Sequence, residues 1–122
     1  MKHNIKTIEI SLTPAISDYL EKKIAHLDKF LNPKISEIAM CYVEVGKSTK
    51  HHKKGDFFIT EINLHLGGKS FQAKVEKDDL YASIDMAIDE MVEEVKSFKD
   101  KKHSLIKRGG AKIKALIKAF SN

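Results

Sequence analysis

The glycine pair Gly67-Gly68 constrains the fold of this chain of 122 residues more tightly than any other feature. Alternating apolar and polar residues flank the pair over 57–66 and 70–76, and adjacent glycines favour a tight hairpin because both can adopt positive φ. The register then follows, with cross-strand pairs Leu66–Lys69, Leu64–Phe71, Ile62–Ala73 and Thr60–Val75 on one face and Asn63–Gln72 and Glu61–Lys74 on the other. One face stays apolar and opposite charges meet on the other, which is typical of a half-buried antiparallel pair.

Two amphipathic segments are predicted to cover the apolar face of this hairpin. The first begins at Thr13-Pro14, a good N-cap followed by proline at the first helical position, and stops at Asn32-Pro33. Its apolar stripe comprises Ile16, Leu20, Ile24, Leu27 and Leu31. The second segment, 78–98, can be capped by Asp78 or Asp79, and its helical spacing of three and four places on one face Leu80, Ile84, Ile88, Met91, Val95 and Phe98.

Two further alternating segments complete the predicted sheet. One covers residues 4–12, and the other covers 35–45, where one face carries Ala39, Cys41, Val43 and Val45 and the other carries Ile38, Met40, Tyr42 and Glu44. The order is βαβββα, which predicts an α+β domain with a four-stranded sheet, two helices packed on one face and a basic C-terminal extension. We expect a domain over 1–103 and a basic amphipathic tail over 104–122, in which Gly109-Gly110 breaks the chain.

The length and composition of the chain favour a single soluble domain. The length suits one core, and the chain has neither a run of eighteen apolar residues nor the features of a signal peptide, so we expect a cytoplasmic protein. The single cysteine, Cys41, lies in a strand-like segment and is interpreted as a small buried apolar residue rather than a nucleophile. Disulfide and zinc frameworks are not predicted, and no metal or other cofactor is expected.

Positive charge is concentrated near one end of the sequence. The net charge is +5 with a pI near 9.2, and residues 96–118 hold nine Lys or Arg but one acid, Asp100. A clustered positive charge suggests a polyanionic partner, of which nucleic acid is the commonest and an anionic membrane surface is the rival. The preceding part of the second helix is acidic, so any RNA contact is expected from the first helix, the 47–54 segment, the last hairpin and the 96–108 extension.

The segment Gly46–Gly55 allows two interpretations. It reads GKSTKHHKKG, with four lysines and two adjacent histidines between flanking glycines. It can be a solvated loop, or a finger whose lysines follow a nucleic-acid backbone. Base stacking on the sheet is not predicted, because the outward positions of the last two strands are the polar residues Glu61, Asn63, His65, Gln72, Lys74 and Glu76.

Catalytic motifs are absent from the sequence: there is no phosphate-binding glycine loop, GxSxG or HExxH. The most enzyme-like feature is the row Asp85, Asp89 and Glu93, spaced one helical turn apart. Such a row could hold a cation or perform acid–base chemistry in a small hydrolase, but a solvated helix face is the preferred interpretation. We therefore predict that the protein is not an enzyme and has no catalytic residues.

Two blocks of sequence carry a resemblance to a known family. They are LTPAISDYLEKKIAHLDKFL at 12–31 and GKSFQAKVEKDDLYASIDMAIDEM at 68–91, and the core D-x-Y-x-x-I-D of the second is the more specific part: Asp79, Tyr81, Ile84 and Asp85. On these two blocks the chain resembles the short ribosome hibernation-promoting factors, which are also called ribosome-associated translation inhibitors. Together with the order of the strands, the resemblance covers residues 4–100. That resemblance implies a βαβββα fold, no enzymatic activity, and binding to the small ribosomal subunit in the channel for messenger and transfer RNA. It further implies translation regulation by ribosome hibernation during stress or stationary phase.

The resemblance also implies a set of binding residues. Lys22, Lys23 and Lys29 fall on the family's basic first helix and Lys99, Lys101 and Lys102 near the basic end of the second. The basic residues of the 47–54 segment, the last hairpin and the 96–108 extension complete the set. The predicted ribosomal-RNA-binding residues are Lys22, Lys23, Lys29, Lys47, Lys50, Lys53, Lys54, Lys69, Lys74, Lys96, Lys99, Lys101, Lys102, Lys107 and Arg108. The four signature residues can either stabilise the fold or contact the ribosome. Ribosomal proteins are a further possible partner beside ribosomal RNA.

Two departures from the family pattern qualify these implications. The middle of the second helix carries Glu90, Glu93 and Glu94 where relatives often have Arg or Lys. The tail after Ser104 is too short to be the dimerising domain of long-form relatives. An alternative function is a basic module whose amphipathic tail binds an anionic membrane or a groove on a partner protein. The apolar residues of that tail, set among lysines, are Ile113, Leu116, Ile117 and Phe120.

Overall fold

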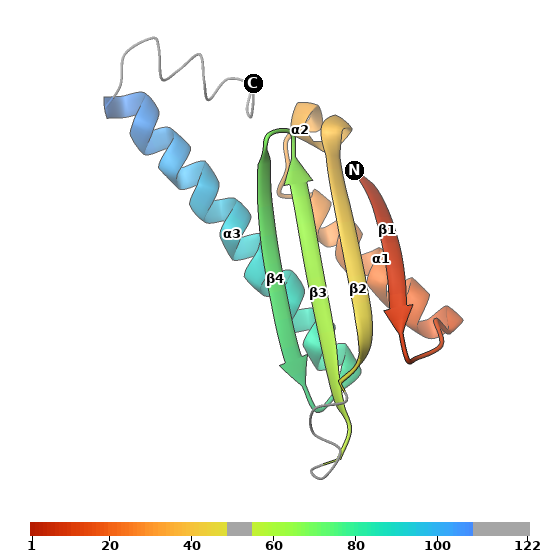
Figure 1. Cartoon of the computed structure of the whole chain (residues 1–122). Coiled ribbons are helices and arrows are strands. Elements are labelled where there is room, and N and C mark those ends of the chain that lie inside the picture. Colours follow the sequence, from red (N-terminus) through yellow and green to blue (C-terminus); the bar gives the residue numbers. More distant parts are fainter. Residues whose placement is uncertain (49–54, 109–122) are drawn as a thin grey trace.

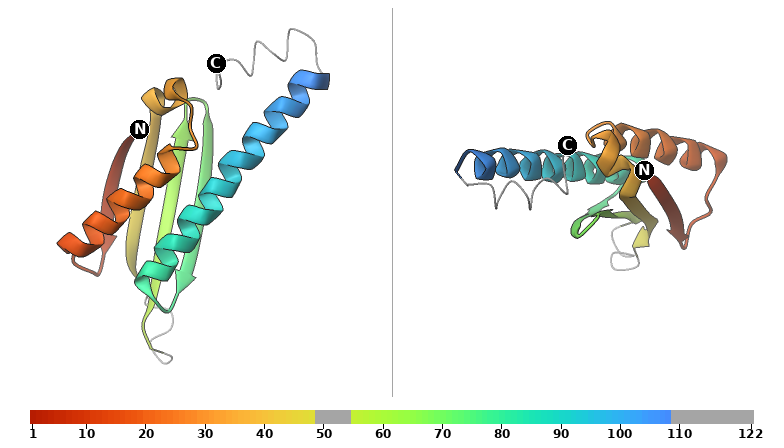
Figure 2. Two further views of the ribbon diagram at one scale, coloured as in Figure 1. Left: turned by 180° about the vertical axis from the view of Figure 1, so that it is seen from behind. Right: turned by 90° about the horizontal axis from the view of Figure 1, so that it is seen from above.

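The computed structural model describes residues 1–48 and 55–108, with the backbone alone for 101–108. Its elements are β1 (Lys2–Ile8), α1 (Pro14–Asp28), α2 (Pro33–Ile38), β2 (Ala39–Ser48), β3 (Phe57–Leu66), β4 (Lys69–Lys77) and α3 (Leu80–Arg108). The strands form one sheet in the order β1-β2-β3-β4, in which β1 runs parallel to β2 and the other neighbours are antiparallel. Both long helices lie on the same face of the sheet, and α3 extends beyond it (Figures 1 and 2). The predicted α+β order is confirmed, with α2 as an addition.

The β3–β4 hairpin has the register that the sequence predicts. Leu64 pairs with Phe71, Ile62 with Ala73 and Glu61 with Lys74, and Gly67 adopts a φ of 67° in the turn. The carboxamides of Asn63 and Gln72 also pair across the strands, and the Gln72 amide donates a hydrogen bond of 2.9 Å to the Glu61 carboxylate. The apolar residues of this register are buried against the helices, so the pattern of one face determines the pairing.

The first strand ends earlier than predicted. The sequence suggested a strand over 4–12, but β1 stops at Ile8 and the next residue, Glu9, has a φ of 61°. This left-handed conformation turns the chain out of the strand. Ile10 still packs against the core while Leu12 is exposed, so the alternation of 8–12 reflects the connection to α1 rather than pairing in the sheet.

The segment after α1 also differs from the prediction. A strand was expected from residue 35, but residues 33–38 form the short helix α2, and the strand begins at Ala39. Asn32 caps this helix by accepting a 2.9 Å hydrogen bond from the Ile35 amide, and Pro33 occupies its first turn. The Asn-Pro pair predicts the end of the first helix, and in the structure the same two residues also start the next one.

The core lies between the helices and the inner sheet face. It includes the predicted stripes of α1 and α3 and the inward residues of β2, where Cys41 is fully buried. Burial raises the pKa of the Cys41 thiol to about 12, which leaves it protonated and unreactive, as predicted for a structural cysteine. One buried polar pair joins sheet to helix, since the hydroxyls of Thr60 and Ser83 lie 2.8 Å apart.

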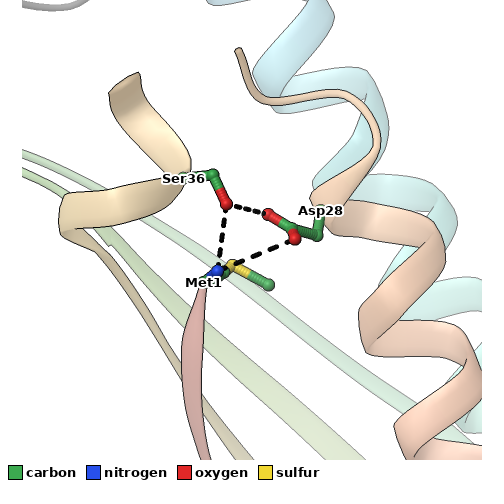
Figure 3. Close-up of polar contacts among 3 residues, drawn as sticks. All are labelled: Met1, Asp28 and Ser36. Atoms are coloured by element: carbon green, nitrogen blue, oxygen red, sulfur yellow. Dashed lines mark hydrogen bonds and ion pairs between the residues drawn. The ribbon is translucent and has the colours of Figure 1, made fainter. Parts of the chain in front are cut away.

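A polar cluster holds the start of β1 to both helices that follow it (Figure 3). The Met1 amino group donates to the Ser36 hydroxyl at 3.0 Å and lies 3.7 Å from an Asp28 carboxylate oxygen. Ser36 in turn donates to Asp28 at 2.8 Å. Met1 directly precedes β1, Asp28 ends α1 and Ser36 lies in α2, so the cluster fixes the edge strand and the short helix against α1.

Candidate nucleic-acid interface

The lysines of α1 divide into exposed and engaged side chains. The side chains of Lys22 and of Lys29, the C-cap residue of the helix, are exposed and have no ion-pair or hydrogen-bond partner among the described residues. Lys23 is partly buried, its Nζ lies 3.1 Å from an Asp85 oxygen, and it approaches the Tyr19 ring at 5.5 Å. Two lysines of this helix are therefore available to an external anion, whereas Lys23 also joins α1 to α3.

The signature residues lie at the start of α3, and two of them, Tyr81 and Asp85, contact α1. Asp79 caps α3 by accepting a 2.8 Å hydrogen bond from the Ala82 amide, and Ile84 is fully buried. The Tyr81 ring packs edge-on against Tyr19, with centroids 4.8 Å apart. The signature residues thus supply a helix cap, a core side chain and a ring contact, and the Tyr81 ring is 37% exposed.

Asp85 is the signature residue with the most partners. It accepts a short hydrogen bond from the Tyr19 hydroxyl and pairs with Lys23. The bond to Asp85, followed by desolvation, raises the pKa of Tyr19 to about 12. The solvated helix face of the preferred interpretation is partly covered at this position, because Tyr19 and Lys23 of α1 contact Asp85. Asp89 and Glu93 are exposed, and Glu93 lies 3.7 Å from Lys96.

The basic end of α3 contacts the end of α1. The Lys96 ammonium lies 5.5 Å from the centre of the Phe30 ring, and Lys99 donates a short hydrogen bond to the Phe30 carbonyl. Lys99 is thus partly committed to holding the two helices together. The helix backbone continues to Arg108; the side chains of Lys101, Lys102, Lys107 and Arg108 lie outside the described part.

The lysines near the ends of the strands are widely separated. Lys47 lies 3.4 Å from Asp56 across the 49–54 segment, while Lys50, Lys53 and Lys54 fall outside the described residues. At the other end of the sheet, the ammonium of Lys69 lies 5.9 Å from the Phe71 ring centre. Lys74 is exposed on the outward face of β4. The predicted lysines whose side chains are described therefore lie on different sides of the domain instead of converging on one pocket.

An exposed aromatic residue on the sheet escaped the sequence reasoning. Tyr42 on β2 is 45% exposed, and its ring packs edge-on against His65 of β3 at 5.6 Å. The alternation predicts Tyr42 on the face opposite Cys41, whereas the prediction against base stacking rests on the outward residues of the last two strands alone. The alternation of 35–45 contained the signal that could have found it.

The described residues 1–48 and 55–108 contain no group of three or more His, Cys, Asp or Glu side chains arranged to hold a metal ion. Within the same ranges, no helix is both long and apolar enough to cross a membrane.

Comparison with known proteins identifies the family. Residues 3–103 match the model of the sigma 54 modulation protein / S30EA ribosomal protein family. The chain belongs to this family. The S30EA family match includes α1, the hairpin and the signature of α3.

Individual S30EA relatives agree with this assignment. The chain is 31% identical over 101 residues to a ribosome hibernation promoting factor of Klebsiella oxytoca, covering 83% of this chain and 96% of that protein. It is 22% identical over 111 residues to the ribosome hibernation promotion factor of Bacillus subtilis, covering 91% of this chain but 55% of that longer relative. The crystal structure of the Thermus thermophilus Protein Y N-terminal domain superposes with a TM-score of 0.66 at 31% identity, over 80% of this chain and 99% of that domain.

Proposed function

We propose that this protein is a ribosome-associated translation inhibitor that binds the small ribosomal subunit in the channel for messenger and transfer RNA. The observation that carries the proposal is the match of residues 3–103 to the S30EA family, whose members compared above are named ribosome hibernation promoting factors. Cytoplasmic ribosomes in stressed or stationary-phase cells are the proposed target, and hibernation is the proposed outcome.

The charge distribution supports an RNA partner. Lys22 and Lys29 project from α1 away from the core, and Lys74 projects from the open sheet face. Lysines in such positions can neutralise phosphates from more than one side of a body that enters a channel. The acidic turns of α3 at Glu90 and Glu94 are proposed to face away from phosphate, because like charges repel at short range.

The proposed mechanism needs no bond making or breaking. A rigid domain occupies the space in which transfer RNA binds, and its lysines supply affinity by releasing counterions from ribosomal RNA. The firm α1–α3 contact through Tyr19, Asp85 and Lys23 suits this role, because a body that excludes by occupancy must keep its shape. No catalytic residue, metal or other cofactor enters the mechanism.

The decisive experiment is co-sedimentation of the full chain with purified small subunits over a salt series. If about eight phosphates are neutralised, the affinity is expected to fall by roughly 10³- to 10⁵-fold between about 50 and 200 mM salt. Bound protein should also compete with transfer RNA for the subunit. Absence of co-sedimentation at low salt, or binding that leaves transfer-RNA occupancy unchanged, would contradict the proposal.

The division into a ribosome-binding domain over 1–103 and a basic tail over 104–122 is part of the proposal. The alternative in which the tail binds an anionic membrane is tested by vesicle flotation, comparing the full chain with a variant that ends at Gly109. Flotation of the full chain alone, together with failure to bind small subunits, would favour the membrane alternative.

A further inference from the structure

The sheet face opposite α1 and α3 is left uncovered by the described elements (Figures 1 and 2). Strand register arranges its outward side chains in rows that cross all four strands. The row nearest α2 consists of Lys2, Met40, His65 and Ser70, and the next consists of Asn4, Tyr42, Asn63 and Gln72. Neither row contains a carboxylate. We call these two rows the carboxamide–tyrosine surface.

The third row marks the boundary of this surface. It reads Lys6, Glu44, Glu61 and Lys74 across the four strands. Its two glutamates lie directly opposite each other in the centre and a lysine occupies each edge. An anionic ligand is therefore favoured on the two rows nearest α2 and disfavoured over the centre of the third, because phosphate and carboxylate repel.

Tyr42 stands at the centre of the carboxamide–tyrosine surface and is held in place. Its ring is 45% exposed and meets the His65 ring edge-on at 5.6 Å with an interplanar angle of 78°. The His65 imidazole is itself fixed by a 2.8 Å hydrogen bond between Nδ1 and the Ser70 hydroxyl. An exposed aromatic ring whose neighbours restrict it loses little freedom when a flat ligand stacks on it.

Carboxamides flank Tyr42 on both neighbouring strands. Asn4 and Asn63 are its direct cross-strand partners, and Gln72 follows Asn63. The Asn63 and Gln72 amides each donate one hydrogen bond to Glu61, at 3.2 and 2.9 Å. A carboxamide has two N–H donors and a carbonyl acceptor, so each group keeps a second donor and its acceptor in an orientation set by Glu61.

We infer that this surface binds an unpaired base of single-stranded RNA, with the base stacked on Tyr42 and its edge hydrogen-bonded by Asn63 or Asn4. A nucleobase presents an aromatic face and a mixed donor–acceptor edge, and the surface presents the complement of both. Lys2 and Lys6 on β1 lie beside Asn4, where they can contact the phosphates that adjoin the stacked base. The inference rests on the proposed function and gives the RNA a second contact, remote from α1.

The test uses the absence of tryptophan from the chain. Tyr42→Trp places a single indole on the surface, and its fluorescence is titrated with short unstructured oligoadenylate at low salt. Stacking is expected to quench the indole in proportion to RNA bound. Met86→Trp, at an exposed position of α3 on the helix-covered side, is the matched control and is expected to keep its fluorescence at equal saturation.

Affinity provides the second readout, measured by anisotropy of the labelled oligoadenylate. Tyr42→Phe keeps a stacking ring and is expected to bind as the unmodified chain does, whereas Tyr42→Ala should bind about 5- to 100-fold more weakly. Circular dichroism checks that both variants fold. No RNA binding, no quenching of Tyr42→Trp on saturation, or equal affinities of the Ala and Phe variants would overturn the inference.

The outcomes separate this inference from the proposed function. If Tyr42→Ala binds small subunits and oligoadenylate as tightly as the unmodified chain, the surface does not stack a base and the ribosome proposal stands. If Tyr42→Ala weakens subunit binding while oligoadenylate fails to quench Tyr42→Trp, the surface contacts a ribosomal protein and the RNA inference is wrong. If the unmodified chain binds oligoadenylate but no subunit, the proposed function fails alone.

Discussion

Asp85 illustrates how one residue of a family signature can organise a tertiary contact. It joins Tyr19 and Lys23 of α1, which lie more than sixty residues away in the sequence, to the second turn of α3. The carboxylate thus has a neutral donor and a cation as partners, and both come from a single helix face. Loss of either partner is expected to loosen the packing of α1 on α3 without changing either helix.

Removal of the Tyr19 hydroxyl is expected to destabilise the fold. Tyr19→Phe deletes the donor to Asp85 while keeping the ring contact with Tyr81, so we expect a decrease of about 1–3 kcal/mol in the free energy of unfolding. Urea denaturation followed by circular dichroism measures the change. Tyr81→Phe is the matched control, because it preserves the ring pair and removes no hydrogen bond found among the described residues. Equal stabilities of the two variants would contradict a stabilising hydrogen bond from the Tyr19 hydroxyl to Asp85.

The same contact predicts a dependence on alkaline pH. The pKa of Tyr19 rises from its usual 10.0 to about 12, first through the bond to Asp85. Because the folded-state pKa is the higher one, the stabilisation is complete below about pH 10 and is lost as the pH rises through 12. Ultraviolet titration of a Tyr42→Phe/Tyr81→Phe variant, which retains Tyr19 alone, measures this pKa. Adding Asp85→Asn should return it toward 10.0; an unchanged value would exclude Asp85 as the cause.

At the scale of elements, α2 shows how a local cap can override a strand pattern. Residues 35–38 continue the alternation of β2 in the sequence, yet Asn32 and Pro33 start a helical turn there. Ile35 then points into the core and Ser36 reaches Asp28 and the amino group of Met1 (Figure 3). The short helix is therefore fixed at both its cap and its side chains.

Asn32→Ala is expected to lower the free energy of unfolding by about 1 kcal/mol, because the Ile35 amide loses its acceptor. Asn32→Asp keeps an acceptor at the same position and should remain close to the unmodified stability. Thermal and urea unfolding measure both. If the Asp variant is destabilised as much as the Ala variant, the side chain does not act as the cap.

At the scale of the whole molecule, the folded chain sorts its cations into two classes. Lys23 and Lys99 are bound within the domain, whereas Lys22 and Lys29 are exposed on α1. A count of charges along the sequence does not distinguish these engaged lysines from the exposed ones. In the folded protein, the exposed lysines can neutralise phosphates and release counterions from a polyanion without breaking a contact within the domain, whereas the engaged lysines also contribute to stability.

The double variant Lys22→Ala/Lys29→Ala is expected to weaken small-subunit binding and to reduce the slope of log affinity against log salt by about 2, roughly one per lost phosphate contact. Co-sedimentation over a salt series measures both quantities. Lys34→Ala, an exposed lysine of α2 outside the predicted interface, is the control and should leave the slope unchanged. An identical loss in the control would show that overall charge, and not the α1 surface, determines binding.

The sequence by itself determined the features that depend on neighbouring residues. Periods of two and of three to four residues predicted the strands and long helices, and the glycine pair with its flanking pattern predicted the register from Leu66–Lys69 to Thr60–Val75. Caps at Thr13 and Asp79 were equally local. These predictions succeed because backbone geometry and the burial of one face depend on residues only a few positions apart.

Only the tertiary structure decided which side chains from distant segments meet. The pairing of Tyr19 with Asp85 and of Lys99 with the Phe30 carbonyl required the helices to be packed in one particular alignment. The row that places Tyr42 between Asn4 and Asn63 likewise required the parallel register of β1 with β2. Such contacts depend on the relative shift of whole elements, which no local period encodes, and they distinguish the lysines that hold the domain together from those left for a partner.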